Sequence, residues 1–443
     1  MEFCGIINDK IISLFSGDVM KEFYLKPKFL GCMKEYSKEQ LIKDLIAGII
    51  VAIIALPLSI ALALASGVEP VCGVYTAIFA GFIVSFLGGS NVQISGPTAA
   101  FATVVAGIVA TRGMSGLVCA TLLAGILLIL MGVFKLGTLI KFVPKTITIG
   151  FTAGIAVTIF IGQIKDFLGI TYSAGVKPIE TLEKITENIK AISTVSLEAL
   201  IIGAVSLVIL IIYPKFEKKV PPSLIAVIVG ALAVKFIPFF DKGIYTIGEL
   251  YRIPSGLPKF VLGNFSLTVN DFVAVLPDAV TIAVLAAIES LLSCVVADGM
   301  VNSKHNPNAE LLAQGVGNMA SVLFGGIPAT GAIARTAANA KNGGRTPVAG
   351  MIHAVVLLLV VLFIMPYAGL IPMPTIAAVL FIVAYNMSEW REFLDIVKTA
   401  HKTDAFIMIL TFLLTVIFDL VVAIAVCMVL HLLILLVFKK VKK

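Results

Sequence analysis

The sequence predicts an all-α, polytopic membrane protein. Hydrophobic residues make up 59% of the 443 residues and charged residues only 13%, about half of the roughly 25% that is usual in soluble domains. The apolar residues form long continuous blocks, and several blocks reach the roughly 20 residues that a helix needs to cross a bilayer. We therefore expect lipid to be the solvent for most of the chain.

Fourteen apolar stretches follow one another along the chain, in two groups of seven. They cover approximately 45–65, 71–88, 97–110, 116–134, 145–164, 195–213 and 221–238, and then 271–296, 309–324, 329–340, 348–365, 373–386, 404–418 and 419–437. This spacing predicts a cytoplasmic segment (1–40), a first transmembrane repeat (41–238), an extracytoplasmic loop (239–270), a second repeat (271–438) and a short basic tail (439–443).

The placement of the basic residues predicts the orientation. Most Lys and Arg lie in short segments between the apolar stretches, which makes the net charge of +7 a topology signal rather than a sign of nucleic-acid binding. If the N-terminus is cytoplasmic, the short cytoplasmic connections carry most of these Lys and Arg residues. The basic residues that face outward concentrate in two longer loops, 165–194 and 239–270. We expect a multi-pass protein of the cell membrane with both termini in the cytoplasm. No signal peptide is indicated.

The third stretch of each group is short and rich in small residues. One follows the motif at 95–100 and the other the motif at 325–332. The spacing also repeats, since Pro57 precedes Pro97 by 40 residues and Glu289 precedes Pro328 by 39. Because seven is odd, the second group must enter the membrane with the opposite orientation. Interrupted segments at matching places of an inverted repeat are typical of a substrate site at the membrane midplane, so we expect spans 3 and 10 to be half-helices.

The start of each half-helix is predicted to hold an anion. We expect Pro97 and Pro328 in the first helical turn, where a proline loses no needed amide hydrogen. The amides that follow have no acceptor within the helix, and each helix N-terminus carries roughly half a positive charge. The predicted substrate-binding residues are Pro97, Thr98, Ala99, Ala100, Ala329, Thr330, Gly331, Ala332 and Arg335. The alternative is that both motifs only mark kinked or re-entrant segments that serve packing.

Glu289 lies inside an apolar run, Val280–Val296, where an ionised carboxylate is costly. Ser293 follows one helical turn later, which allows a small polar cluster. These two residues are the candidates for binding a coupling ion, with Glu289 as a proton carrier. The alternative for Glu289 is a carboxylate that hydrogen-bonds a neighbouring helix and only joins the two.

The other polar residues in the apolar stretches can be interpreted as functional or as structural. Arg335 could attract the anion from beneath the site, or it could satisfy carbonyl groups or extend to the cytoplasmic face. Gln93, Gln163 and Asn318 are more typical of hydrogen bonds between helices, and His353 is most simply a packing or polar-contact residue. The segment around Trp390 indicates an interfacial helix.

Motifs for enzymatic chemistry are absent from the sequence. It contains no phosphate-binding loop, no Ser/His/Asp set and no HExxH motif, so we expect neither an enzyme nor a protein driven directly by ATP, and no cofactor. The six Cys are scattered without metal-ligand spacing, which argues against disulfides and metal sites.

At the residues described above, the sequence resembles the sulfate permease (SulP) family, which includes solute carriers that exchange sulfate and bicarbonate. The matching segments are 44–82, 88–101, 286–300 and 309–350, and together they cover both repeats. The resemblance implies a core domain (spans 1–4 and 8–11) that moves against a gate domain (spans 5–7 and 12–14), and commonly a homodimer. Members usually carry a cytoplasmic STAS domain after the last span. Because this chain stops at Lys443, we expect that the domain is lacking or that the sequence is truncated.

In the bicarbonate branch of the family, the positions that resemble Glu289, Ser293, Gly331 and Ala332 form a sodium site. Here Ile333 replaces a threonine, which favours proton over sodium coupling. The leading expectation is thus a secondary transporter of a small anion such as sulfate, bicarbonate or a dicarboxylate. The alternatives are a nucleobase permease of the same fold, an uncoupled anion channel, and a sensor or scaffold that does not transport.

Overall fold

The protein is described from a computed structural model, over residues 25–138, 144–174, 176, 178, 180–217, 220–240, 243–251, 256–261, 269–417, 426–427 and 429–430. Within these residues, six helices are long and apolar enough to cross a membrane. The predicted tail (439–443), most of the predicted last span (419–437) and residues 1–24 of the predicted N-terminal segment lie outside the described residues.

The helices of the first repeat follow the predicted stretches. They are α3 (Lys38–Ala65), α4 (Pro70–Leu87), α5 (Ala99–Val133), α6 (Lys145–Leu168), α8 (Leu197–Phe216) and α9 (Pro222–Phe236). α5 contains both the third and the fourth predicted span. The two parts are separated at Gly113, whose φ of 68° and ψ of −174° interrupt the helix, a conformation that glycine adopts readily.

The second repeat consists of helices in the same order. They are α12 (Leu276–Val301), α13 (Pro307–Leu323), α14 (Ile333–Lys341), α15 (Val348–Phe363), α16 (Met373–Met387) and α18 (Lys402–Ile417). Shorter helices lie between or before the spans: α2 (Lys28–Cys32), α7 (Thr181–Lys190), α10 (Ile247–Leu250), α11 (Val269–Ala274) and α17 (Trp390–Thr399). α17 is amphipathic, and its Phe393 packs edge-on against Phe412 of α18, as expected for an interfacial helix.

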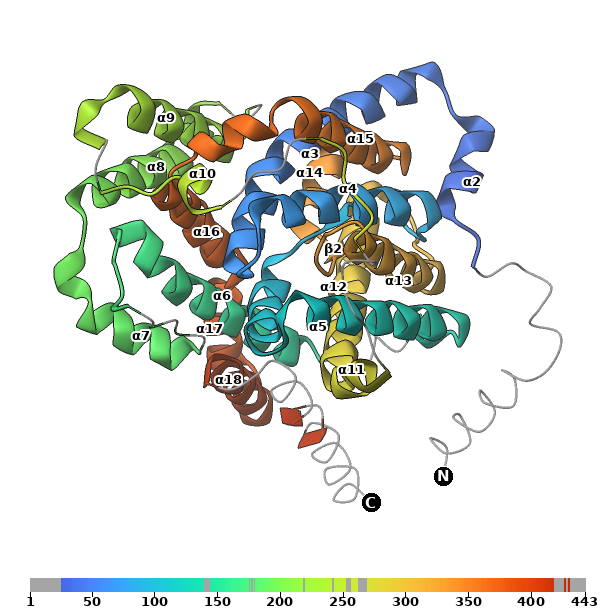
Figure 1. Ribbon diagram of the computed structural model, residues 1–443. Coiled ribbons are helices and arrows are strands. Elements are labelled where there is room, and N and C mark those ends of the chain that lie inside the picture. The colour runs from blue at the N-terminus through green and yellow to red at the C-terminus, as the bar shows by residue number, and fades with distance from the viewer. Residues whose placement is uncertain are drawn as a thin grey trace.

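The spans form two groups that mix the repeats (Figure 1). One group contains α3, α4, α5, α12, α13, α14 and α15, and the other contains α6, α8, α9, α16 and α18. These groups match the predicted core and gate domains. Within the core, α5 and α13 approach closely because Gly125 and Gly315 face each other. A Cβ on Gly315 would lie 2.5 Å from the Gly125 carbonyl oxygen, so larger side chains there would push the helices apart.

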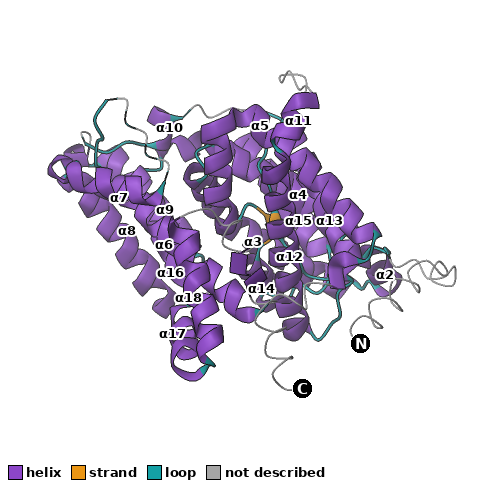
Figure 2. Ribbon diagram, turned by 90° about the horizontal axis from the view of Figure 1, so that it is seen from below, coloured by secondary structure: helices purple, strands orange, loops and turns teal. Residues whose placement is uncertain are grey.

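Two short strands pair in the middle of the core group (Figure 2). We call this strand pair, together with the helix starts that follow it, the crossing. β1 (Ser95–Gly96) precedes α5, and β2 (Thr330–Gly331) precedes α14. They pair antiparallel, with Ser95 opposite Gly331 and Gly96 opposite Thr330. Each strand belongs to a different repeat, and the antiparallel pairing brings the two repeats together at equivalent positions in opposite directions. The strand pair therefore fixes the positions from which both half-helices begin.

Candidate functional site

The two half-helices begin beside the strand pair. α5 starts at Ala99 with Thr98 as its N-cap residue, and α14 starts at Ile333 with Ala332 as its N-cap residue. The Ala332 amide extends the pairing by donating to the Ile94 carbonyl at 2.8 Å. The structure thus brings together the two motifs that the sequence places more than 230 residues apart, as the register of Gly96 with Thr330 shows.

The predicted starting points of the half-helices were wrong. Pro97 lies just before the N-cap of α5 instead of in its first turn, and Pro328 lies four residues before the N-cap of α14. The physical reason is the strand pairing, since the residues after Pro328 remain extended in β2 before the helix can begin. Proline in these positions favours the extended conformation of the segment rather than opening the helix.

The expected bare amides also differ from the structure. The Ala329 amide donates to Asn318 Oδ1 at 2.8 Å, and the Gly331 amide donates to Ser290 Oγ at 3.0 Å. Both amides are therefore already bonded and offer no donor to a ligand, contrary to the prediction.

The first turns of the helices supply donors instead. In α14, the first intrahelical bond runs from the Thr336 amide to the Ala332 carbonyl, so the amides of Ile333, Ala334 and Arg335 have no acceptor within the helix. In α5, the amides of Ala99 and Ala100 occupy the equivalent place. The donors on the second half-helix thus lie several residues later than the sequence predicted.

Glu289 on α12 contacts the first half-helix. Thr98 Oγ1 donates to Glu289 Oε2 at 3.0 Å, and both residues are partly exposed. Ser293, one turn later, contacts the second half-helix instead, because its hydroxyl donates to Thr336 Oγ1 at 3.3 Å. The predicted polar cluster of α12 is therefore divided between the two half-helices. In the residues that the structure describes, no group of three or more His, Cys, Asp or Glu side chains could hold a metal ion.

Arg335 ties the second half-helix to the segment before the first. Its Nη2 donates to the Pro97 carbonyl, whereas its buried Nη1 has no hydrogen-bond partner among the residues that the structure describes. The side chain is only 3% exposed, so it does not extend to the cytoplasmic face. The guanidinium places a positive charge directly at the crossing, with one nitrogen still able to donate.

A small accessible surface lies where the two helix N-termini meet. Most residues of the crossing are buried, but Thr98 and Glu289 are partly exposed and Ile333 and Ala334 are exposed, Ile333 by 43%. The first turn of α14 thus has exposed residues, whereas Ala99 and Ala100 at the start of α5 are buried. The accessible residues thus belong to both half-helices and to α12.

A buried hydrogen-bond network supports the crossing, and sequence reasoning missed most of it. Glu310 on α13 is fully buried and accepts hydrogen bonds from the Gly89 amide (2.9 Å), Gln93 Nε2 (3.2 Å) and Gln314 Nε2 (3.1 Å). Gln93 also donates to the Ser290 carbonyl at 3.0 Å, as its predicted role between helices implied.

The same network continues into the strands. Gln314 Oε1 accepts from Ser95 Oγ at 3.2 Å, and Ser95 Oγ also reaches the Thr330 carbonyl at 2.9 Å. Ser290 Oγ lies 2.8 Å from Thr330 Oγ1. The signal that could have found these residues is the spacing of Glu310, Gln314 and Asn318, which places three polar side chains along one face of an otherwise apolar span.

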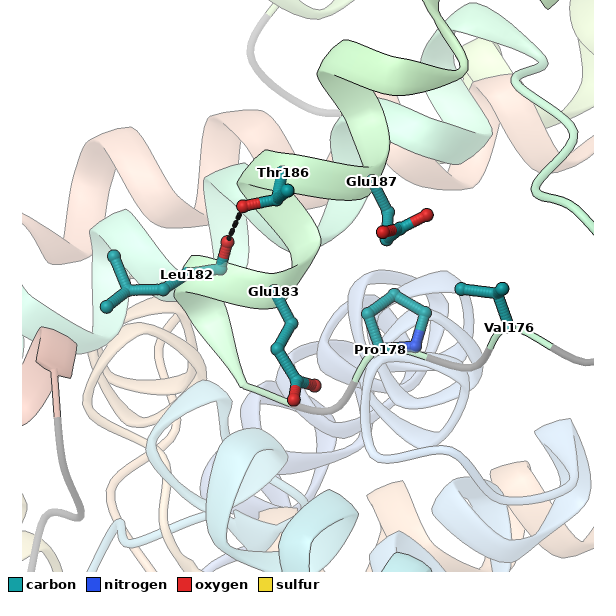
Figure 3. A pocket seen from close by; sticks show the side chains of 6 residues that line it. All are labelled: Val176, Pro178, Leu182, Glu183, Thr186 and Glu187. Carbon is teal, nitrogen blue, oxygen red and sulfur yellow. Dashed lines mark hydrogen bonds between the residues drawn. The ribbon is translucent and has the colours of Figure 1, made fainter.

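An open pocket of about 480 Å³ lies elsewhere, along α7 (Figure 3). It is lined by Leu182, Glu183, Thr186 and Glu187 of α7 together with Val176 and Pro178 of the preceding segment. None of the residues predicted to bind substrate lines it. Its carboxylates also make it a poor site for an anion.

The fold and the crossing define a class of protein. Two half-helices of an inverted repeat, meeting in the core of a polytopic membrane protein, are typical of membrane transporters.

Comparison with known proteins identifies the family. The model of the sulfate permease family matches residues 41–411, and the chain belongs to this family. It is similar to the candidate sulfate transporter YvdB of Bacillus subtilis (44% identical, covering 90% of this chain and 74% of that protein) and to the bicarbonate transporter BicA of Picosynechococcus (33% identical, covering 86% and 68%). These relatives are transporters, in agreement with the expectation that the chain is not an enzyme.

A solved structure agrees with this assignment. The transmembrane domain of a cyanobacterial bicarbonate transporter BicA superposes with a TM-score of 0.77 at 31% identity, covering 88% of this chain and 98% of that domain. The predicted fold class is therefore confirmed.

Proposed function

We propose that this protein is a secondary active transporter of a small inorganic or carboxylate anion, such as sulfate, bicarbonate or a dicarboxylate. The observation that carries the proposal is the strand pair, which sets the N-termini of α5 and α14 beside each other in the core. The names of the relatives YvdB, a candidate sulfate transporter, and BicA, a bicarbonate transporter, point to the same class of substrate.

The anion is proposed to lie between the two first turns. The amides of Ala99 and Ala100 would approach it from one side and those of Ile333 and Ala334 from the other. Two helix dipoles then act on one negative charge, which favours anion binding without a lysine in the site. Arg335 adds a buried positive charge and its unpaired Nη1. Pro97, Thr98 and the segment Ala329–Ala332 shape the site, since their groups are largely engaged in holding the crossing.

Glu289 is proposed to carry the coupling ion, a proton in preference to sodium. Its carboxylate accepts a hydrogen bond from Thr98, which is the N-cap residue of the first half-helix. The charge of Glu289 therefore changes the electrostatic potential where the anion would bind. An ionised Glu289 repels the substrate anion, whereas a protonated Glu289 does not. The alternative sodium site would use Glu289 with Ser293, Gly331 and Ala332, but the apolar Ile333 stands where the bicarbonate branch of the family carries a threonine hydroxyl, which favours the proton.

Transport is proposed to occur by alternating access, with the core group moving against the gate group. We also propose a homodimer in the cell membrane with both termini in the cytoplasm, as the resemblance and the charge pattern imply.

Reconstitution tests the proposed function. Purified protein in proteoliposomes is given labelled sulfate, bicarbonate and succinate at two pH values, with and without a sodium gradient. We expect uptake of at least one anion to rise with an inward proton gradient. Lack of uptake of every anion under every gradient contradicts the proposal, and single-channel currents that need no cation gradient favour an anion channel.

A further inference from the structure

A second pocket, lined by basic residues, lies beside α2 and the connection between α12 and α13. It has a volume of about 280 Å³, and its lining includes Lys26, Lys28 and Lys304 together with His305 and Asn306. These residues come from the segment before α3 and from the connection between α12 and α13. The predicted topology places both at the cytoplasmic ends of spans. The pocket is therefore at the depth where a bilayer meets the cytoplasm.

The pocket is a built feature because three chain segments are bonded together around it. The Lys28 amide donates to the Gly88 carbonyl at 3.0 Å, and the Asn306 amide donates to the Gly89 carbonyl at 2.8 Å. The Gly88–Gly89 turn after α4 thus holds both walls. A Cβ on Gly89 would lie 1.9 Å from the Asn306 carbonyl oxygen, so the close contact requires glycine.

The positive charge of the pocket is not neutralised by its surroundings. In the described part of the chain, Lys26, Lys28 and Lys304 form no ion pair with a carboxylate. The nearby carboxylate of Asp298 is engaged by the loop itself. It lies 2.7 Å from His305 Nδ1 and accepts from the His305 amide and the Ser303 hydroxyl, each at 2.9 Å.

The helix N-terminus beside the pocket contributes little to this charge. Asn306 Oδ1 already accepts from the amides of Asn308 and Ala309 in the first turn of α13. The lysines are therefore the groups that remain to bind a ligand, and their number favours a phosphate over a single carboxylate.

An exposed apolar strip adjoins the lysines. Phe82 and Phe86 of α4 are exposed by 36% and 40%, and Leu30 of α2 by 52%. Phe29, the residue after Lys28, packs against Phe86 with their ring centroids 5.1 Å apart. In a membrane-spanning protein this strip faces acyl chains. In a ligand that carries a phosphate and an acyl chain, the phosphate can contact the lysines while the chain contacts the apolar strip.

From this juxtaposition we infer that the pocket of Lys26, Lys28 and Lys304 binds the phosphate headgroup of an anionic phospholipid, with its acyl chain along Phe82 and Phe86. Basic pockets at the cytoplasmic face of membrane proteins recognise such headgroups. The inference is independent of the transported anion, because it concerns different residues on another part of the core.

Binding of a short-chain lipid tests the inference. The full chain in neutral detergent is titrated with dioctanoyl phosphatidylglycerol and, separately, with dioctanoyl phosphatidylcholine and glycerol phosphate. We expect saturable binding of the first lipid that is at least tenfold tighter than that of the other two compounds. Equal binding of phosphatidylcholine overturns headgroup recognition, and equally tight binding of glycerol phosphate overturns the role of the acyl chain in favour of a soluble phosphate.

Variants identify the residues. The triple change Lys26→Gln, Lys28→Gln and Lys304→Gln should weaken lipid binding on the order of a hundredfold, since each lysine near an anionic lipid contributes about fivefold. The matched control removes Lys341, Lys398 and Lys402, which are exposed at other ends of the predicted cytoplasmic face, and should change affinity less than about threefold. Equal losses in both variants contradict a specific pocket.

A second variant separates the two parts of the ligand. Phe82→Ala with Phe86→Ala should weaken binding of the lipid at least fivefold and leave glycerol phosphate binding unchanged. Unchanged lipid binding refutes the proposed acyl path. If the triple lysine variant elutes as aggregate, Lys304→Gln alone decides, with an expected loss of about fivefold.

Discussion

Replacing Glu289 with glutamine should separate substrate binding from coupled accumulation. A glutamine side chain cannot carry a proton across the membrane, but its oxygen can still accept the Thr98 hydroxyl that now lies 3.0 Å from Glu289 Oε2. The change therefore replaces a hydrogen bond from Thr98 to a titratable carboxyl group by one to a neutral amide. This weakens the contact between residues 98 and 289 by about 1 kcal/mol. Because the neutral glutamine resembles the protonated acid, which does not repel the anion, the affinity for the anion should change by no more than about fivefold, the equivalent of 1 kcal/mol.

The effect on accumulation should be much larger. A gradient of one pH unit supplies about 1.4 kcal/mol for each coupled proton, which supports roughly tenfold accumulation of the anion. Without a proton carrier this driving force is lost, and the internal concentration should only equal the external one. The assay measures uptake of labelled anion into proteoliposomes with and without a pH gradient, together with anion exchange at equal pH, which needs no net proton movement.

The interaction with Thr98 provides the matched comparison. Thr98→Val removes the donor while keeping the acid, so accumulation should persist at reduced rate, and the effects of the two changes should not add because the residues are in contact. Thr111→Val is the control, since within the described part of the chain this hydroxyl bonds only to carbonyls of its own helix. Accumulation by Glu289→Gln equal to that of the unmodified protein would refute the assignment of Glu289 as the proton carrier.

Further changes test the support of the crossing. Gly331→Ala should lower uptake at least tenfold, because its Cβ would lie 2.0 Å from Gln93 Nε2, whereas Gly107→Ala, whose Cβ meets nothing within 4 Å, should leave uptake unchanged. Similar uptake in the two variants would argue against a tightly held strand pair. Glu310→Gln should lower the free energy of unfolding by about 2 kcal/mol, because the glutamine NH2 group would face one of the three N–H donors that now bond to the carboxylate. Thermal unfolding in detergent measures this, and an unchanged melting temperature would show that the network does not need the carboxylate. Asp278→Asn should destabilise by less than about 1 kcal/mol, since its ion pair with Arg112 is partly exposed.

The sequence predicts the spans well because membrane helices are defined by local composition. The start of α3 at Lys38 lies before the apolar stretch at 45–65, since its polar first turns extend beyond the hydrocarbon and are capped by Ser37, whose hydroxyl accepts from the Gln40 amide. The break between the third and fourth spans was also predictable, because Gly113 lies between two apolar stretches. Local signals were sufficient in both places.

The details of the site depend on contacts between distant residues, which one sequence does not contain. Pro97 and Pro328 indicated the correct segments, but the exact helix starts follow from the pairing of β1 with β2. The Ala329 and Gly331 amides are occupied by Asn318 and Ser290, and only the packing of α12 and α13 against β2 reveals this. That Glu289 has a polar partner was predictable, because a carboxylate in an apolar run is costly without one, and its role in coupling stays a prediction.

The central claim is that one anion lies between the first turns of α5 and α14. A crystal structure with selenate, an analogue of sulfate whose selenium scatters anomalously, tests it most directly. We predict an anomalous peak within hydrogen-bonding distance of the Ala99 or Ala100 amide and of the Ile333 or Ala334 amide. A peak confined to another part of the molecule, in crystals of protein shown to bind selenate, would contradict the account.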